Sequence, residues 1–179
     1  MNPSLVGSEM CIRDRVSTCP SAAAYEEEGV TTVNDASTAV GDTTVITTDG
    51  AQFTVGDIVS FSTTAGQNDY DDGHQYRITG ISTHTLTIVQ KESGSGGLHT
   101  TITNGGKIRR RWKYYDSVGT GPATSTYASE RSGVNDEIHV VVIDEDGEIT
   151  GVPGSVLETF EKLSKAADAK SPQGDNNYY

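Results

Sequence analysis

Hydrophobic and polar positions alternate in short runs along most of the chain, but one stretch near the C-terminus differs. Residues 138–143, Ile-His-Val-Val-Val-Ile, form a nearly continuous apolar run that is rich in β-branched side chains. Such a run suits a strand that is buried on both faces, as in an α/β sheet. Asp-Gly follows at 146–147, and this pair between apolar runs is a strong hairpin signal. We expect a strand over 138–143, a tight turn over 144–147 and a short return strand over 148–150.

The segment after this hairpin has helical periodicity. Its apolar residues recur at the spacing of one helical face: Val156, Phe160, Leu163 and Ala167. Ser155 precedes them as a candidate N-cap, and Glu158 completes a capping box. We therefore expect an amphipathic helix from Ser155 to about Ala169. A single strand–hairpin–helix unit cannot cover both faces of its strand, so we expect the chain to be a fragment of a longer protein.

A different pattern occupies residues 33–108, where short β-prone runs alternate with Gly, Asp and Asn turns. The runs lie at 44–47, 56–61, 75–81 and 85–89, and 98–103 is a candidate fifth run. Strands at this spacing, separated by turn residues, are typical of a small all-β barrel or sandwich. Residues 108–116 are expected to form a further strand. Residues 16–32 form a flank with a short helical turn that ends at Gly29.

The first residues do not contribute to the fold that we expect. Residues 4–15, SLVGSEMCIRDR, resemble a string that recurs at the ends of unrelated proteins translated from shotgun metagenomic reads. We interpret residues 1–15 as an adapter-derived, disordered artefact; they have no apolar core segment and are not a signal peptide. Cys11 lies in this segment. With Cys19 as the only other cysteine, the chain predicts neither a metal site nor a disulfide framework.

Charge narrows the classes of partner. The formal net charge is −12, which disfavours nucleic acid or an anionic membrane as the main partner. No apolar run approaches the roughly 20 residues that span a bilayer. One basic cluster stands out, with Trp112, Tyr114 and Tyr115 interleaved: Lys107, Arg109, Arg110, Arg111 and Lys113. Such a cluster either binds single-stranded nucleic acid or pairs with an acidic surface of its own or a neighbouring subunit. We expect the second, and predict that the cluster lies at or near a subunit interface.

Two groups of acidic residues are candidates for metal sites. Asp69, Asp71 and Asp72 precede His74, and oxygen ligands at alternate positions near a glycine resemble a calcium loop. The bidentate glutamate at the twelfth position is missing, so a solvated loop is the preferred interpretation and these aspartates are weak candidates. The acids at 144–146 are explained by the hairpin turn. We expect no metal and no cofactor.

No enzyme is expected either. His139 lies beside Glu137 within the predicted strand, where a histidine satisfied by hydrogen bonds is the preferred interpretation over a catalytic base. The chain lacks a Gly-x-Ser-x-Gly elbow, and the glycines at 151 and 154 lack the lysine of a P-loop. We assign no catalytic residue.

Two longer segments are similar to a known family. They read RWKYYDSVGTGPATSTYASERSG at 111–133 and NDEIHVVVIDEDGEITGVPGSVLETFEKLSKAADAK at 135–170, with NNYY at the end. Together, residues 111–179 resemble the contractile tail sheath protein of T4-like myoviruses, especially those of the cyanophage type. The resemblance is weaker over residues 33–108. This region resembles the inserted surface domains by which sheath proteins differ from one another.

The resemblance implies a structural virion protein. Sheath subunits form six-membered rings that stack helically around the tail tube, and contraction drives the tube through the host envelope. The implied partners are further copies of the subunit, the tail tube protein and the baseplate, with no nucleic acid and no membrane insertion. The implied location is the virion tail, assembled in the host cytoplasm. The family's core is an α/β domain likened to subtilisin, so residues 109–179 would be a truncated part of that core. Terminal arms of the family add strands to neighbouring subunits; neither arm can be located in this sequence.

The β domain also suggests one alternative function. The β domain at 33–108 would act by itself as a module that binds a glycan or a host surface. Its aromatic platform would have to come from Phe53, Phe61, Tyr70 and Tyr76.

Overall fold

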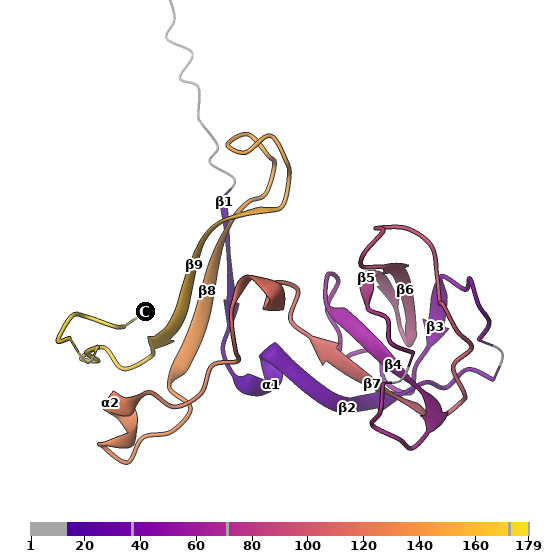
Figure 1. Cartoon of the computed structure of the whole chain (residues 1–179), viewed down its shortest axis with the longest axis horizontal. Helices are drawn as coiled ribbons and strands as arrows, with labels where there is room; N and C mark the ends of the chain where they lie inside the picture. The colour runs from indigo at the N-terminus through magenta and orange to yellow at the C-terminus, as the bar shows by residue number, and fades with distance from the viewer. Residues whose placement is uncertain (1–13, 37, 71, 172, 179) are drawn as a thin grey trace, which may run out of the picture.

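Two antiparallel sheets dominate the regular structure of the computed structural model, which describes residues 14–36, 38–70, 72–171 and 173–178. Figure 1 shows a long three-stranded sheet beside a tightly curled six-stranded sheet, with α1 (Ala22–Tyr25) between them. The β-rich character expected from the sequence is confirmed, whereas an α/β core is not seen in the described residues. Within those residues, no helix has the length and apolar character that crossing a bilayer requires.

The six-stranded sheet has the order β2-β7-β4-β5-β6-β3. Its strands are β2 (Glu26–Thr32), β3 (Thr44–Ile46), β4 (Ile58–Ala65), β5 (Tyr76–Ser82), β6 (Thr85–Gln90) and β7 (Gly106–Arg111). The two outer strands meet where the Asn34 amide donates to the Ile46 carbonyl at 2.8 Å and the Thr48 amide donates to the Thr32 carbonyl at 2.9 Å. The sheet therefore curls around its own core. The strands predicted at 44–47, 56–61, 75–81 and 85–89 are confirmed.

The core of this sheet is filled by apolar side chains that alternate along its strands. The Phe61 and Tyr76 rings lie 5.5 Å apart between centroids and are fully buried. The candidate strand at 98–103 is wrong, because this segment forms no strand. Its two apolar residues, Leu98 and Ile102, are nevertheless 1% and 2% exposed. Their backbone amides donate hydrogen bonds to Asp42 and Thr38 and do not take part in strand pairing. Burial in the core, and not a place in a strand, therefore explains why these residues are apolar.

The curled sheet extends beyond residues 33–108 at both ends. Residues of the predicted flank form β2, and the predicted helical turn is α1, which ends at Tyr25 rather than at Gly29. Ser21 caps α1 by accepting a hydrogen bond from the Ala24 amide at 3.2 Å. The strand predicted over 108–116 ends at Arg111, after which a 3-10 turn, η1 (Tyr115–Ser117), begins a loop. A short helix, α2 (Thr126–Ser129), follows.

The second sheet has the order β1-β8-β9, with β8 (Glu137–Asp144) in the centre between β1 (Asp14–Cys19) and β9 (Ser155–Ser164). The strand predicted at 138–143 is confirmed, and its residues are mostly buried. Asp14 and Arg15, which belong to the segment interpreted as artefact, pair with Asp144 and Ile143. Residues 1–13 lie outside the described part of the chain.

The helix predicted from Ser155 to Ala169 is wrong, because most of this segment is β9. Val156 pairs with Ile143, and Phe160 pairs with Val140. Two bulges in this pairing interrupt the alternation of inward and outward side chains along β9. The apolar residues of β9 are therefore spaced as they would be on one face of a helix. The competing constraint is the unpaired edge of β8, whose backbone amides and carbonyls need partners when the strand is buried.

The return strand predicted at 148–150 is also wrong, because these residues form a turn within a longer hairpin loop. Gly147 has a φ of +80°, as the Asp-Gly signal predicted. The Asp144 carboxylate organises this loop by accepting hydrogen bonds from the amides of Gly147 at 2.9 Å, Ile149 at 3.2 Å and Thr150 at 2.7 Å. Burial opposes ionisation of Asp144, but these donors outweigh it and lower the pKa of Asp144.

Candidate functional site: the arginine strand and the junction between the sheets

The basic cluster predicted from the sequence lies on and after β7, which is an interior strand between β2 and β4. In the β2–β7 register, Glu27 lies opposite Arg110 and Glu26 lies opposite Arg111. Opposite charges directly across an antiparallel pair attract each other. The arginines thus pair with acidic residues of their own chain. The sequence had left open whether these acidic partners belong to the same chain or to a neighbouring subunit.

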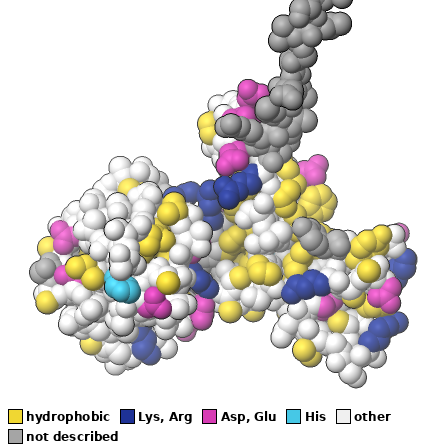
Figure 2. Space-filling view, turned by 180° about the vertical axis from the view of Figure 1, so that it is seen from behind, with side chains coloured by type: hydrophobic (Ala, Val, Ile, Leu, Met, Phe, Trp, Pro, Cys, Tyr) yellow, Lys and Arg dark blue, Asp and Glu magenta, His cyan; other side chains and the backbone are white. Residues whose placement is uncertain are grey.

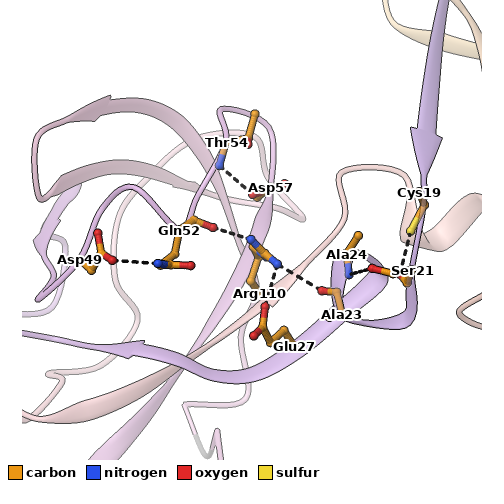
Figure 3. Close-up of polar contacts among 10 residues, drawn as sticks. All are labelled: Cys19, Ser21, Ala23, Ala24, Glu27, Asp49, Gln52, Thr54, Asp57 and Arg110. Carbon is orange, nitrogen blue, oxygen red and sulfur yellow. Dashed lines mark hydrogen bonds and ion pairs between the residues drawn. The ribbon is translucent and has the colours of Figure 1, made fainter. Parts of the chain in front are cut away.

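Arg110 joins three separate segments, as Figure 3 shows. Its Nη2 donates to the Glu27 carboxylate on β2 at 2.9 Å and to the Ala23 carbonyl in α1 at 3.2 Å. Its Nη1 donates to the Gln52 carbonyl, in the loop before β4, at 2.5 Å. The planar guanidinium is suited to this role, because its donors leave in fixed directions. We call this group of contacts the Arg110 clamp.

The loop that the clamp holds is itself ordered by two aspartates. Gln52 donates to Asp49 at 2.8 Å, and the Thr54 amide donates to Asp57 at 2.8 Å (Figure 3). Burial raises the pKa of Asp57, and the Thr54 amide and the nearby charge of Arg110 oppose this rise only in part. The carbonyl of Gln52 is therefore presented to Arg110 by a preformed turn.

Arg109 and Arg111 share a single carboxylate. Arg111 Nε and Nη2 donate to the two Glu26 oxygens at 2.8 and 3.3 Å, and Arg109 Nη1 lies 3.8 Å from Glu26. Their guanidinium groups also stack on aromatic rings, Arg109 at 4.6 Å from the Tyr70 centroid and Arg111 at 5.1 Å from that of Tyr115. Burial acts to lower the pKa of Arg111, but Glu26 outweighs it and raises that pKa.

The two lysines of the cluster are placed differently. Among the residues that the structure describes, neither Lys107 nor Lys113 belongs to an ion pair. The Lys113 Nζ lies 5.0 Å from the Tyr114 ring centroid and faces the cleft described below. The interface prediction stays a prediction for all five residues, but only these two lysines have charges that are available to a partner.

A second, smaller core fills the junction between the two sheets. It is made of one face of the three-stranded sheet and the segments on either side of the curled sheet: Cys19, Tyr25, Trp112, Tyr115, Val118, Val141 and Ile143. The Trp112 amide donates to the Tyr25 carbonyl at 2.8 Å. Burial raises the pKa of the Cys19 thiol to about 11, which keeps the thiol protonated and unreactive at neutral pH.

A cleft of about 620 Å³ lies beside this core, between the two sheets. Its lining combines apolar side chains with both signs of charge: Val55, Trp112, Ile143, Lys113, Asp57 and Glu145. Figure 2 shows Lys and Arg side chains gathered at this junction. Arg15 and Glu145 form an exposed ion pair across its rim at 3.3 Å. The lining presents no arrangement of groups that indicates a reaction.

The acidic loop does not form a cation site in the described residues. Asp69 accepts a short hydrogen bond from the Ser62 hydroxyl, and Asp72 accepts one from the His74 amide at 3.2 Å. Asp71 lies outside the described residues. Across the described ranges, no set of three or more acidic, histidine or cysteine side chains is placed to hold a metal ion.

The aromatic residues on which a glycan platform would depend are buried, three of them in the core of the curled sheet. Phe53, Phe61, Tyr70 and Tyr76 are between 0% and 7% exposed. Tyr70 and Tyr76 use their hydroxyls as acceptors for the amides of Gly29 and His99. These four rings are not available for stacking on a sugar.

Sequence reasoning missed a set of acids that hold the segment 119–125 against the three-stranded sheet. Asp136 accepts hydrogen bonds from the Ser125 amide and hydroxyl at 2.8 and 2.7 Å, and a short one from the Ser164 hydroxyl. Glu137 accepts from the Ala123 amide at 2.9 Å. Burial opposes ionisation of Asp136, but the Ser164 and Ser125 donors outweigh it and lower its pKa. No local motif announces these contacts, because their partners are distant along the chain.

Comparison with known proteins gives no assignment: no protein-family model, no curated protein and no solved structure matches this chain.

The Arg110 clamp predicts a marked loss of stability on truncation. We expect Arg110→Ala to lower the free energy of unfolding by about 2–3 kcal/mol, because Glu27 and two carbonyls lose a charged donor. The exposed Arg15 is the matched control, and Arg15→Ala should cost less than about 0.5 kcal/mol. Urea unfolding followed by circular dichroism measures both. Equal losses in the two variants would contradict the clamp.

The lowered pKa of Asp136 predicts acid sensitivity. A carboxylate with a folded-state pKa below its unfolded value stabilises the fold above the unfolded value, near pH 4, and loses this contribution as pH falls through the folded value. Asp136→Asn should therefore be less stable than wild type at pH 7, with a difference that shrinks by pH 2.5. Urea midpoints at the two pH values test this, and a difference that is constant with pH would refute it.

Proposed function

We propose that this chain is part of a contractile tail sheath subunit, with a structural and not a catalytic role. The observation that carries the proposal is the state of the three-stranded sheet, most of which is built from the residues that resemble the sheath family. In the described residues, one face of this sheet is covered by the junction core; on the other face Val140 is buried, whereas Val16 and Phe160 remain exposed.

The open face is visible from the strand register. Val16 pairs with Val142, and Phe160 pairs with Val140, so these side chains lie on the face opposite Val141 and Ile143. Val16 is 55% exposed and Phe160 is 42% exposed. Figure 2 shows apolar side chains gathered over this part of the molecule. A sheet with an apolar face needs a second layer, and further sheath protein would supply it in the proposed assembly.

The edges of the same sheet support the proposal. Among the described residues, β1 and β9 each pair as strands only with β8. Open strand edges present unpaired amides and carbonyls to other chains, and a repeating assembly can use them for contacts between subunits. We propose that the sheet belongs to the sheath core and that its open edges and face are assembly surfaces.

The curled six-stranded sheet would then be a domain carried on the outside of the subunit. Its core is separate from the junction core and is closed on itself. The Arg110 clamp fixes this domain to α1, so that it would move with the sheath core during contraction. No observation favours the glycan-binding alternative, because its aromatic residues are buried.

The open face gives a direct test in a full sheath protein that contains this segment. We expect Phe160→Glu to abolish tube formation in electron micrographs while the far-ultraviolet circular dichroism stays unchanged, because a charge cannot be buried unpaired in the covering layer. Val40→Glu is the matched control, since Val40 is 67% exposed and lies on the curled domain. Tubes formed normally by the Phe160 variant would contradict the proposal.

The basic cluster gives a second test in the same assay. Charge reversal of the arginines would disturb the fold, so the interface prediction is tested at the lysines. The double variant Lys107→Glu, Lys113→Glu should assemble poorly, and more so at low salt, because an interfacial charge interaction is screened by salt. If the double variant assembled as well as wild type at low salt, the prediction that this cluster lies at a subunit interface would be wrong.

A further inference from the structure

His139 is fully buried, and both of its ring nitrogens are occupied. Its Nδ1 accepts a hydrogen bond from the Lys162 amide at 3.0 Å, and its Nε2 lies 2.7 Å from the Thr120 carbonyl. A nitrogen that accepts from an amide has no proton, so the ring is neutral with its proton on Nε2. This arrangement confirms the expectation of a histidine satisfied by hydrogen bonds.

The two partners belong to different segments, and the histidine joins them. The β8–β9 register changes between Ile138 and Val140, which leaves a bulge opposite His139. At this bulge Lys162 has a φ of +55° and donates its amide to the imidazole rather than to the strand ladder. Thr120 lies in the loop after η1. His139 thus holds the end of β9 and the loop 119–123 to the central strand.

We propose that His139 is a proton-operated latch for these two segments. A second proton on the ring would place an N–H on Nδ1, facing the Lys162 amide across 3.0 Å. Two donors cannot share a hydrogen bond, and both would be buried without an acceptor. The protonated ring is therefore compatible with the fold only when β9 separates from it at the bulge. Protonation of the ring by acid therefore opens the latch.

The charged and titratable groups around the ring define what else acts on it. From β1 the buried Cys19 lies directly opposite, and from α1 the Tyr25 ring lies edge-on at 6.3 Å between centroids. On the strands themselves the neighbours are Glu137, Glu161 and Lys162. The two glutamates accept hydrogen bonds from the amides of Ala123 and Gly119, at 2.9 and 3.2 Å. Both carboxylates are engaged by these amides, and neither replaces the acceptor that the Lys162 amide requires.

The opening is confined to one end of the sheet. The rest of the β8–β9 ladder, from Val140 to Asp144, pairs without this ring, and the curled sheet has its own core. Mild acid is thus expected to release residues 119–123 and 161–164 while leaving β4 to β6 in place. This inference concerns the fold of the chain itself and does not depend on the sheath proposal.

Amide hydrogen exchange at pH 7.5 and pH 5.5, corrected for the intrinsic effect of pH, tests the latch. Peptides that cover 119–123 and 161–164 should exchange at least about tenfold faster at pH 5.5 in the wild type, and β4 to β6 should not change. His139→Gln should lose this pH dependence. His99→Gln is the control, because His99 is exposed and distant from the latch, and it should behave as wild type. Unchanged exchange in the wild type, or pH dependence retained by His139→Gln, would overturn the proposal.

A measurement on the wild type alone guards against a variant that fails to fold. Nitrogen-15 chemical shifts of the histidine rings report the tautomer and the protonation of each ring. The latch requires His139 to carry its proton on Nε2 at pH 7.5, and its protonation must coincide with the loss of the Lys162 amide signal. An Nδ1–H tautomer, or protonation with the Lys162 amide still protected, would refute the latch without any substitution.

Discussion

Three consecutive arginines on an interior strand are the constraint on which the arrangement of this chain depends. Strand β7 lies between β2 and β4, and the side chains of Arg109, Arg110 and Arg111 are only 17% to 20% exposed. Partly buried cations need partners, and truncation of one partner leaves the other uncompensated. The partners are Glu26 and Glu27 on β2. Pairing them fixes β2 beside β7, and with β2 it fixes α1 and the chain that leads back to β1.

The junction core builds on this placement. Once α1 is held by Arg110, Tyr25 is carried to the face of β8 and packs edge-on against Tyr115 and His139. The junction core then covers Val141 and Ile143, which lie on the face of β8 that is turned toward α1. The same geometry leaves Val16 and Phe160 exposed on the other face. The internal ion pairs thus hold β2 and α1 in place against one face of the three-stranded sheet, and we propose that the exposed apolar side chains on its other face serve assembly.

The sequence predicted those parts of the fold in which neighbouring residues carry the signal. Strands β3 to β6 follow from alternation and turn residues, and Gly147 adopts the positive φ that its Asp-Gly pair indicated. The helix at 155–169 could not be rejected from sequence, because two bulges in β9 give its apolar residues a helical spacing. The arginine cluster was recognised, but its partners at Glu26 and Glu27 lie more than 80 residues away. The contacts of Asp136 and His139 were beyond prediction for the same reason: each joins segments that only the folded chain brings together.

The claim that the Arg110–Glu27 pair fixes β2 beside β7 is tested most directly by a double-mutant cycle. The variants are Arg110→Ala, Glu27→Ala and the pair together, with unfolding free energies from urea titrations at pH 7. The account predicts a coupling energy of about 1–2 kcal/mol between the two positions, since a charged hydrogen bond that is partly shielded from water is lost only once in the double variant. Effects that add within about 0.3–0.5 kcal/mol, as for independent sites, would contradict it.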